Sequence, residues 1–433
     1  MIFVILLFIG LAVLDLVIEL LNLHSWAATL PAEFNGYYDN ERYSVAQKYL
    51  ADKTVSGLVK EITLITFIAL FIILGGFNFI DSVARGLLAG PVGRGLVFAG
   101  ILFALFFLLN LPFDIYDTFV IEEKYGFNKT TAWTFCLDAV KILFLSGLFG
   151  AIVFSAIIWL FEKTGAFAWI YGWLALSLFQ LLIMYIAPVV IMPLFNRFSP
   201  LEDGKLKTEI EQLSQKENFQ IKGIYTMDGS KRSSKANAAL TGFGKFKRIM
   251  LYDTLIKQLD ENEIVAVLAH EIGHYKHKHI VKSILISLAV SAVGFFVFSR
   301  LMNQPFLFKA FGAQNVSIYA ALIYFSILII PIQRVGSVCS SWISRSFEYT
   351  ADQYAVRAAD NPEALISALK KISADSMANL QPHPVKVFFD YSHPPILQRI
   401  KELRKFSAAD TNLTADRDER TIQRNDSRGG TAL

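Results

Sequence analysis

Cysteine is nearly absent from this 433-residue chain, and charged residues are scarce. Cys136 and Cys339 are the only cysteines, which excludes a disulfide framework and a cysteine-rich zinc site. Charged residues make up 18% of the chain against 54% hydrophobic residues, a balance too apolar for an ordinary soluble enzyme. The net charge of +4 comes without a long basic run, which argues against nucleic acid as a partner. The sequence therefore predicts an integral membrane protein.

Long apolar runs provide the membrane-spanning segments that this composition requires. Spans are expected at roughly 2–23, 62–80, 96–113, 139–161, 166–190, 281–302 and 316–336. The first run lacks a basic start and a small-residue cleavage site, so it is not expected to be a signal peptide. Residues 24–61 suit a surface helical hairpin or loop, and a short loop with Arg85 and Arg94 is expected after the second span.

Two acidic residues, Asp15 and Glu19, lie four positions apart in the first expected span and therefore on one helix face. Charges at that depth usually face a protein interior or a water-filled cavity. A snorkelling or protonated pair near the end of the helix is the alternative. The sequence leaves both interpretations open.

The composition of residues 196–280 is that of a soluble domain. A polar helix is expected at roughly 201–218, short strands at 223–228 and 247–253, and later helices at 337–359, 362–373 and 394–406. The predicted division of the chain is 1–195 with five spans, 196–280 soluble, 281–336 with two spans, 337–406 soluble, and 407–433 as a disordered tail. The predicted fold is mainly α and polytopic, with about seven transmembrane helices and a small α+β domain.

The soluble segment contains the motif His270-Glu271-Ile272-Gly273-His274. Histidines four apart share a helix face and can bind one metal ion, and Glu271 lies one step round, within reach of a water molecule beside it. This H-E-x-x-H spacing is typical of zinc peptidases. The alternative is a buried histidine pair in an amphipathic helix.

The flanks of the motif favour a helix that ends in a polar turn. Asp260, with Glu263 three residues later, predicts a capping box at the start of the helix. Beyond the motif, His277 and His279 alternate with lysines. We expect these two histidines on a solvated or headgroup-facing turn, and not as metal ligands.

A third metal ligand is expected after the last span, because a catalytic zinc usually has three protein ligands. Glu348 and Asp352 are four apart on an expected helix, so both can face the histidine pair. One can bind the metal while the other accepts a hydrogen bond from a ligand histidine, and Arg345 can neutralise the group. A solvated polar helix face is an equal alternative.

Several further motifs stand at separate places along the chain. They are Pro112-Phe113 through Phe119–Glu123 to Gly126–Lys129, Pro193–Phe198, Asp228–Arg232, Asn237-Ala238 with Gly242–Lys245, Glu348–Asp352 and Tyr391–Pro395. Together with the histidine motif they resemble the type I CAAX prenyl proteases, integral-membrane zinc metallopeptidases of the endoplasmic reticulum with bacterial relatives. The resemblance extends nearly to Phe406.

This resemblance implies a fold of seven long helices around a large water-filled chamber, and a peptidase acting on prenylated peptides in the lipid bilayer. It also implies the following roles: one zinc ion bound by His270, His274 and Glu348, Glu271 as base, Asp352 as partner of the ligands, His393 as oxyanion donor, and Asn237 on the edge that holds the substrate backbone. From the residues alone, His393 before two prolines marks a rigid turn and Asn237 a strand end.

The predicted function is therefore a membrane zinc endopeptidase that processes prenylated CAAX-type peptides at their C-terminus. The alternatives are a quality-control metalloprotease for membrane proteins and a non-catalytic membrane scaffold. Residues 196–280 contain 14 Lys and Arg against 11 Asp and Glu, which favours a catalytic domain facing the cytoplasm. The expected membrane is the bacterial inner membrane or the endoplasmic reticulum; a compact chain without an evident C-terminal retrieval signal is compatible with a bacterial member.

Overall fold

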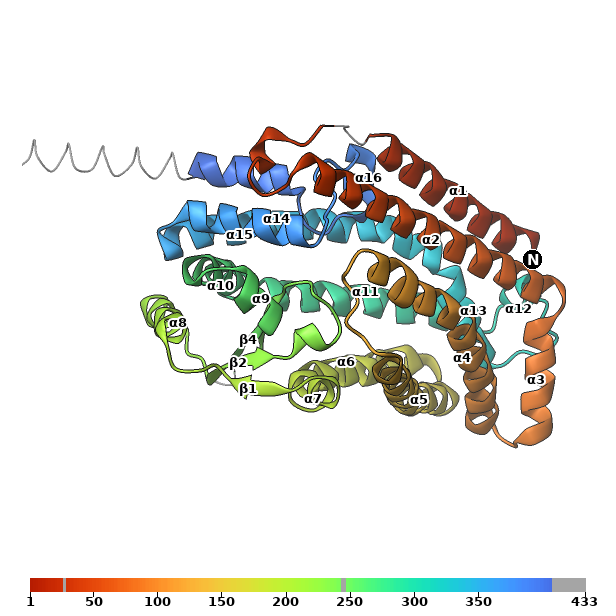
Figure 1. Cartoon of the computed structure of the whole chain (residues 1–433). Helices are drawn as coiled ribbons and strands as arrows, with labels where there is room; N and C mark the ends of the chain where they lie inside the picture. The colour runs from red at the N-terminus through yellow and green to blue at the C-terminus, as the bar shows by residue number, and fades with distance from the viewer. Residues whose placement is uncertain (26–28, 243–246, 407–433) are drawn as a thin grey trace, which may run out of the picture.

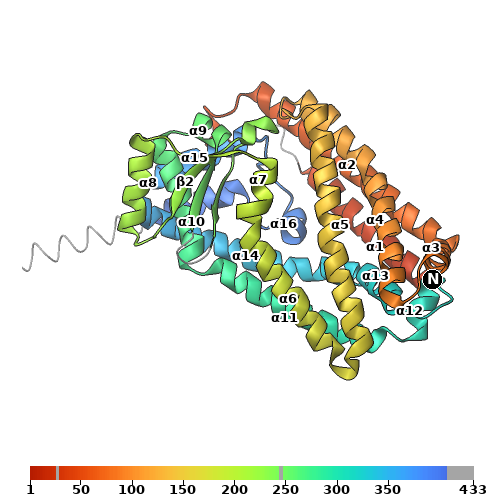
Figure 2. The ribbon, with the colours of Figure 1, turned by 90° about the horizontal axis from the view of Figure 1, so that it is seen from below.

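The computed structural model describes residues 1–25, 29–242 and 247–406, so the predicted tail at 407–433 lies outside the described residues. Long helices form a membrane region, and a small α+β domain lies at one end of them (Figure 1). Helices α3 and α12 lie at the opposite end (Figure 2). The predicted mainly α architecture is confirmed.

The membrane region is built from helices whose apolar runs are long enough to cross a bilayer. Within the described residues, six helices qualify, or seven if α13 and α14, which are bent by 50° at their break, form one span. The spans are α1 (Ile2–His24), α2 (Asn40–Ile73), α4 (Pro91–Tyr116) with a π-helical end (Asp117–Glu122), α5 (Ala132–Lys163), α6 (Ala168–Ile186) with a π-helical end (Ala187–Ile191) and α7 (Met192–Phe195), α11 (His279–Leu301), and the bent pair α13 (Ile318–Leu328) and α14 (Ile330–Ala359). The short helices α3 (Gly76–Leu87) and α12 (Pro305–Ala310) lie between spans.

Two sequence predictions for the first third of the chain are wrong. The expected surface hairpin or loop at 24–61 is in large part the start of α2, because the Asp39 carboxylate accepts a hydrogen bond from the Arg42 backbone N–H at 2.6 Å and caps the helix there. Both arginines of the expected loop are helical, Arg85 in α3 and Arg94 in α4, since Gly75 at φ 73° ends α2 and lets α3 begin at once.

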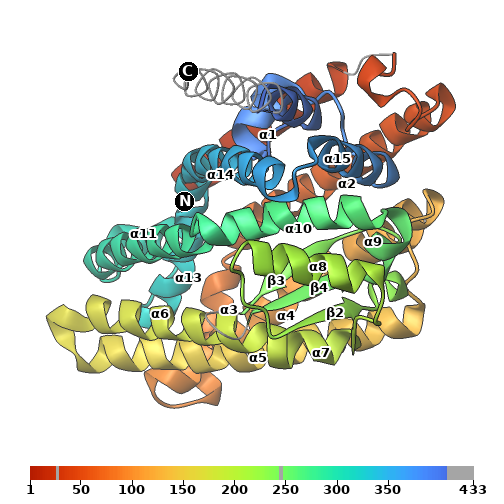
Figure 3. The same ribbon diagram turned by 90° about the vertical axis from the view of Figure 1, so that its left-hand side faces the viewer.

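The small domain combines a four-stranded sheet with helices from both soluble segments. Its strands are β1 (Phe198–Pro200), β2 (Gly223–Met227), β3 (Ala238–Thr241) and β4 (Arg248–Tyr252), and its helices are α8 (Lys205–Lys216), α9 (Asp253–Gln258), α10 (Glu261–Lys276), α15 (Pro362–Asp375), α16 (Pro384–Asp390) and a helix over 396–406. The strand order is β1-β2-β4-β3, with β2 and β4 parallel, which confirms the two predicted strands. Helix α10 lies between the sheet and the pair α14 and α15 (Figure 3).

Within the described residues, most buried hydrophobic side chains belong to two large clusters, one in the small domain and one at the far end of the membrane region, beside a small third cluster of Tyr49, Ile121 and Phe127. The second cluster joins the ends of the spans and is rich in aromatic residues such as Phe77, Phe98 and Tyr324. Helix α11 shows the consequence, since its buried residues, His279 and Phe298, lie near its two ends. The spans therefore pack tightly at one end and much less along their middle.

Candidate metal centre

Helix α10 is held in place by its cap and by one glycine. The predicted capping box is confirmed, with Glu263 N–H donating to Asp260 Oδ1 at 3.0 Å and Asp260 N–H donating to Glu263 Oε2 at 2.9 Å. A Cβ on Gly273 would lie 3.1 Å from the Ala351 backbone of α14. The glycine therefore allows α10 and α14 to approach closely where both carry polar residues.

This close approach brings His270, His274 and Glu348 together. The Nε2 atoms of the two histidines are 3.1 Å apart, Glu348 Oε2 is 3.4 Å from His270 Nε2, and Glu348 Oε1 is 3.3 Å from His274 Nε2. These ligand atoms lie within 4.8 Å of one another. Three residues from two helices thus aim their donor atoms at one point.

One atom of this group is left without a hydrogen bond. Glu348 is buried, and its Oε2 has no hydrogen-bond partner among the described residues, with Arg399 Nη1 at 3.6 Å, although a buried carboxylate oxygen without a hydrogen bond is costly. Two imidazole nitrogens and a carboxylate form the donor set of a peptidase zinc site. The residues present therefore fit a bound metal cation, which would coordinate the unpartnered oxygen.

The opposite side of His270 is fixed by Asp352 and Arg399. His270 Nδ1 lies 2.9 Å from Asp352 Oδ1, and Arg399 binds both oxygens of the same carboxylate at 2.6 and 2.9 Å. The sequence prediction that Arg345 neutralises this group finds no support in its contacts, because Arg345 donates to the carbonyls of Val387 and Tyr391. Arg399 takes that place.

The electrostatics of the site favour cations. Burial disfavours a charged imidazole, but the hydrogen bonds to Asp352 and Glu348 outweigh this and raise the pKa of His270 to about 9. Burial also raises the pKa of the Glu271 carboxyl above its ordinary value, although the neighbouring histidines oppose the change. A carboxyl with a raised pKa is suited to general acid–base chemistry.

The structure brings His393 to the same site but leaves Asn237 at the edge of the sheet. His393 Nε2 lies 3.3 Å from Glu348 Oε1, and the imidazole is largely exposed. Asn237 directly precedes β3, is exposed, and uses its side-chain oxygen to accept a hydrogen bond from Ala238 N–H at 2.9 Å. Their expected roles in oxyanion binding and substrate binding stay predictions.

Near His270, His274 and Glu348, sequence reasoning missed Arg399 and misjudged His279. Arg399 carried no signal of its own, beyond its place in the helix that follows the Tyr391–Pro395 motif. His279 was expected on a solvated turn, and this is wrong, because it is only 4% exposed and contacts His274. The apolar run that starts at Ile280 was a signal that His279 turns inward, whereas His277 is exposed as expected.

The acidic pair of the first span faces charged partners. Arg334 of α14 donates to Asp15 Oδ1 at 2.6 Å, and Lys386 of α16 donates to Glu19. These four residues line a cavity of about 580 Å³ together with Glu61. Asp15 and Glu19 therefore face the protein interior and do not snorkel from a helix end.

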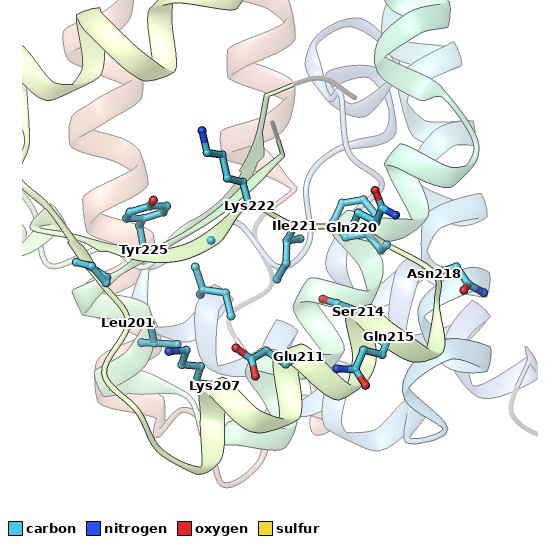
Figure 4. Close-up of a pocket in the computed structure, with 14 residues that line it drawn as sticks. Leu201, Lys207, Glu211, Ser214, Gln215, Asn218, Gln220, Ile221, Lys222 and Tyr225 are labelled. Atoms are coloured by element: carbon cyan, nitrogen blue, oxygen red, sulfur yellow. The ribbon is translucent and has the colours of Figure 1, made fainter. Parts of the chain in front are cut away.

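A second cleft, of about 740 Å³, lies in the small domain between α8, β1 and β2 (Figure 4). Its lining includes Lys207 and Glu211 of α8, and Tyr225 of β2. The metal-binding residues are not part of this lining, so the cleft is separate from the metal centre.

A helix with two histidines four apart, a glutamate from a second helix and a set of membrane spans together define an integral-membrane metallopeptidase. The comparison with known families agrees. Residues 19–197 match the model described as CAAX prenyl protease N-terminal, five membrane helices, and residues 200–407 match that of peptidase family M48.

Relatives and a solved structure cover most of the chain. The CAAX prenyl protease 1 homologue of Arabidopsis thaliana is 35% identical over 87% of this chain and 90% of its own length, and that of Homo sapiens is 34% identical over 87% and 88%. The crystal structure of S. mikatae Ste24p matches with a TM-score of 0.88 and 30% identity, over 92% of this chain and 98% of that one. The chain belongs to peptidase family M48 and is a multi-pass membrane metalloendopeptidase that acts on peptide or protein substrates.

Proposed function

We propose that this enzyme is a zinc endopeptidase that processes prenylated CAAX-type peptides at their C-terminus, with His270, His274 and Glu348 as zinc ligands. The observation that carries the proposal is the convergence of these three donors, at 3.1 to 3.4 Å, around an unpartnered Glu348 oxygen. The names of the matched relatives support the substrate class. Zinc, when bound, supplies the Lewis acid that polarises the scissile carbonyl.

In this proposal, three residues around the ligands have different roles in catalysis. Glu271 takes a proton from the attacking water and delivers it to the leaving amine. His393, largely exposed and next to Glu348, donates a hydrogen bond to the oxyanion as the carbonyl is attacked. Asp352 accepts a hydrogen bond from His270 Nδ1–H, which leaves Nε2 free to bind the metal.

The edge strand β3 is proposed to hold the peptide in extended form. It pairs with β4 on one side, and its position at the end of the order β1-β2-β4-β3 leaves backbone groups on the other side for another strand. It also packs against α10, the helix with the metal ligands. Asn237, just before the strand, is proposed to contact the substrate backbone.

The membrane region is proposed to enclose a water-filled chamber, with the catalytic domain in the cytoplasm. The charged cavity beside Asp15 and Glu19, and the sparse burial along the middle of α11, support the chamber. The excess of basic residues in 196–280 supports the orientation. The division at 1–195, 196–280, 281–336 and 337–406 is kept as a proposal.

The test is cleavage of a farnesylated C-terminal peptide by the purified, zinc-loaded enzyme, beside the same peptide without the lipid. Each buried methylene of the lipid contributes about 0.8 kcal/mol, so the farnesylated peptide should show a clearly higher kcat/KM. The zinc-stripped enzyme should cleave neither. Equal rates on both peptides would instead favour quality-control cleavage of unfolded apolar segments.

A further inference from the structure

Behind the metal ligand His274 lies a second histidine, His279. His274 Nε2 faces His270 and Glu348, while its other nitrogen, Nδ1, lies 3.0 Å from Nδ1 of His279. The two ring nitrogens of His274 therefore have different partners, one toward the metal centre and one away from it.

The chemistry of imidazole fixes the direction of this contact. A neutral histidine that binds a metal through Nε2 carries its proton on Nδ1, which must then donate a hydrogen bond. The Nδ1 of His279 is consequently the acceptor, and the proton of His279 resides on its own Nε2. Only a neutral His279 in this tautomer satisfies His274 as a ligand.

The ring of His279 is fixed by the packing and the backbone around it. Its ring stacks on that of Phe347, with centroids 4.1 Å apart and planes within 6°. Phe347 directly precedes the proposed ligand Glu348 on α14. On the other side, Lys278 adopts φ 56° and turns the chain from α10 into α11, whose first residue is His279.

We propose that His279 is a positioning residue that fixes the tautomer and ring orientation of His274, as Asp352 does for His270. This inference rests on the proposed role of His274 as a ligand. It means that the two histidine ligands have unlike supports, an ion-paired carboxylate for one and a neutral imidazole for the other. It also ties the metal centre to the first residue of a membrane-spanning helix.

Two substitutions separate positioning from packing. His279→Asn keeps an oxygen acceptor near the position of Nδ1 but loses the aromatic ring, whereas His279→Leu keeps apolar packing on Phe347 but has no acceptor. The zinc dissociation constant of the full-length protein, measured by competition with a chelator, should weaken by about 10–100-fold in His279→Leu. His279→Asn should retain most of the affinity, and His277→Leu, the exposed neighbour, should retain all of it.

Absorption of the cobalt-substituted protein gives a second readout that does not depend on turnover. The ligand-field bands should shift in His279→Leu and stay close to the unsubstituted spectrum in His279→Asn. Zinc bound more tightly by the leucine variant than by the asparagine variant would show a packing role and overturn the proposal. If His279→Leu does not fold, His279→Asn decides, because metal lost from it as readily as from His274→Ala would overturn the proposal. An unsubstituted protein that binds no zinc would instead refute the proposed function.

Discussion

Two pairs of acidic residues, each with its members four positions apart, differ in the partners that their carboxylates have. Asp15 and Glu19 on α1 are both ion-paired, with Arg334 and Lys386. On α14, Arg399 donates hydrogen bonds to both oxygens of Asp352 and lies 3.6 Å from Glu348 Oε2, which has no hydrogen bond among the described residues and faces two histidine nitrogens. Carboxylates whose oxygens all have partners hold helices together. A carboxylate oxygen that lacks a hydrogen bond and faces imidazole nitrogens is suited to bind a metal cation.

The largest expected effect is on zinc content, when one residue of each acidic pair is replaced by alanine. Glu348→Ala should be almost free of zinc and inactive, because two histidines alone leave a catalytic site short of a ligand. Glu19→Ala is the matched control and should retain its zinc, since Lys386 still pairs with Asp390 at 2.8 Å. Metal analysis of both purified variants makes the comparison, which fails if Glu348→Ala holds zinc as well as Glu19→Ala.

Within the metal centre, substitution of Glu271 should abolish most of the catalytic activity without affecting zinc binding. Glu271→Ala should retain stoichiometric zinc and lose at least about 100-fold in kcat, the contribution of a positioned general base. Zinc content and peptide turnover on the same preparation are the measurements. Turnover close to that of the unsubstituted enzyme would refute the role of Glu271.

Asp352 should influence the metal through His270. Asp352→Asn keeps the shape of the side chain but removes the charge that pairs with Arg399, so zinc affinity should fall by about 10–100-fold. Chelator competition measures this. Complete loss of zinc from Asp352→Asn, with zinc retained in Glu348→Ala, would show that the two acids exchange roles.

Removing the ion pair between Asp15 and Arg334 should lower the stability of the fold without changing the zinc content. Arg334 bonds to Asp15 and also to Asp390, at 2.5 Å. Arg334→Met leaves Asp15 without its cation and should lower the free energy of unfolding by about 1–3 kcal/mol. The double variant with Asp15→Asn should recover part of this loss, since the unpaired charge is gone. Thermal unfolding in detergent, with zinc content as control, tests both; zinc loss from Arg334→Met would break the comparison.

The smallest expected effect is in the pH profile. In the proposed mechanism Glu271 acts as a carboxylate, and burial raises its pKa, so activity should be lost as pH falls through a value above the ordinary glutamate pKa of about 4.3. The acid limb of kcat/KM should keep its position in Arg334→Met, because the ion-pair partners of Arg334 are Asp15 and Asp390. An acid limb at or below the ordinary value would show that Glu271 is solvated during turnover.

The sequence alone determined what depends on near neighbours in the chain. The i, i+4 spacing placed His270 and His274 on one face of α10, and Asp260 with Glu263 predicted the cap that starts it. Apolar length predicted seven spans, and the described residues contain six helices of that kind, or seven if α13 and α14 form one bent span. Boundaries were less well predicted, since α2 extends far into the polar stretch before its span, where the Asp39 cap decides its start.

The tertiary structure decided which partners each acidic residue meets. Arg334 is 319 positions from Asp15 in sequence, and Arg399 is 47 positions from Asp352. Hydropathy and helical spacing describe a residue's own segment, so they cannot show a partner that arrives from another one. His279 lies on a lysine-rich turn by sequence, and its burial was decided by two structural features: the positive φ of Lys278, which starts α11 at His279, and Phe347 of α14, which stacks on its ring.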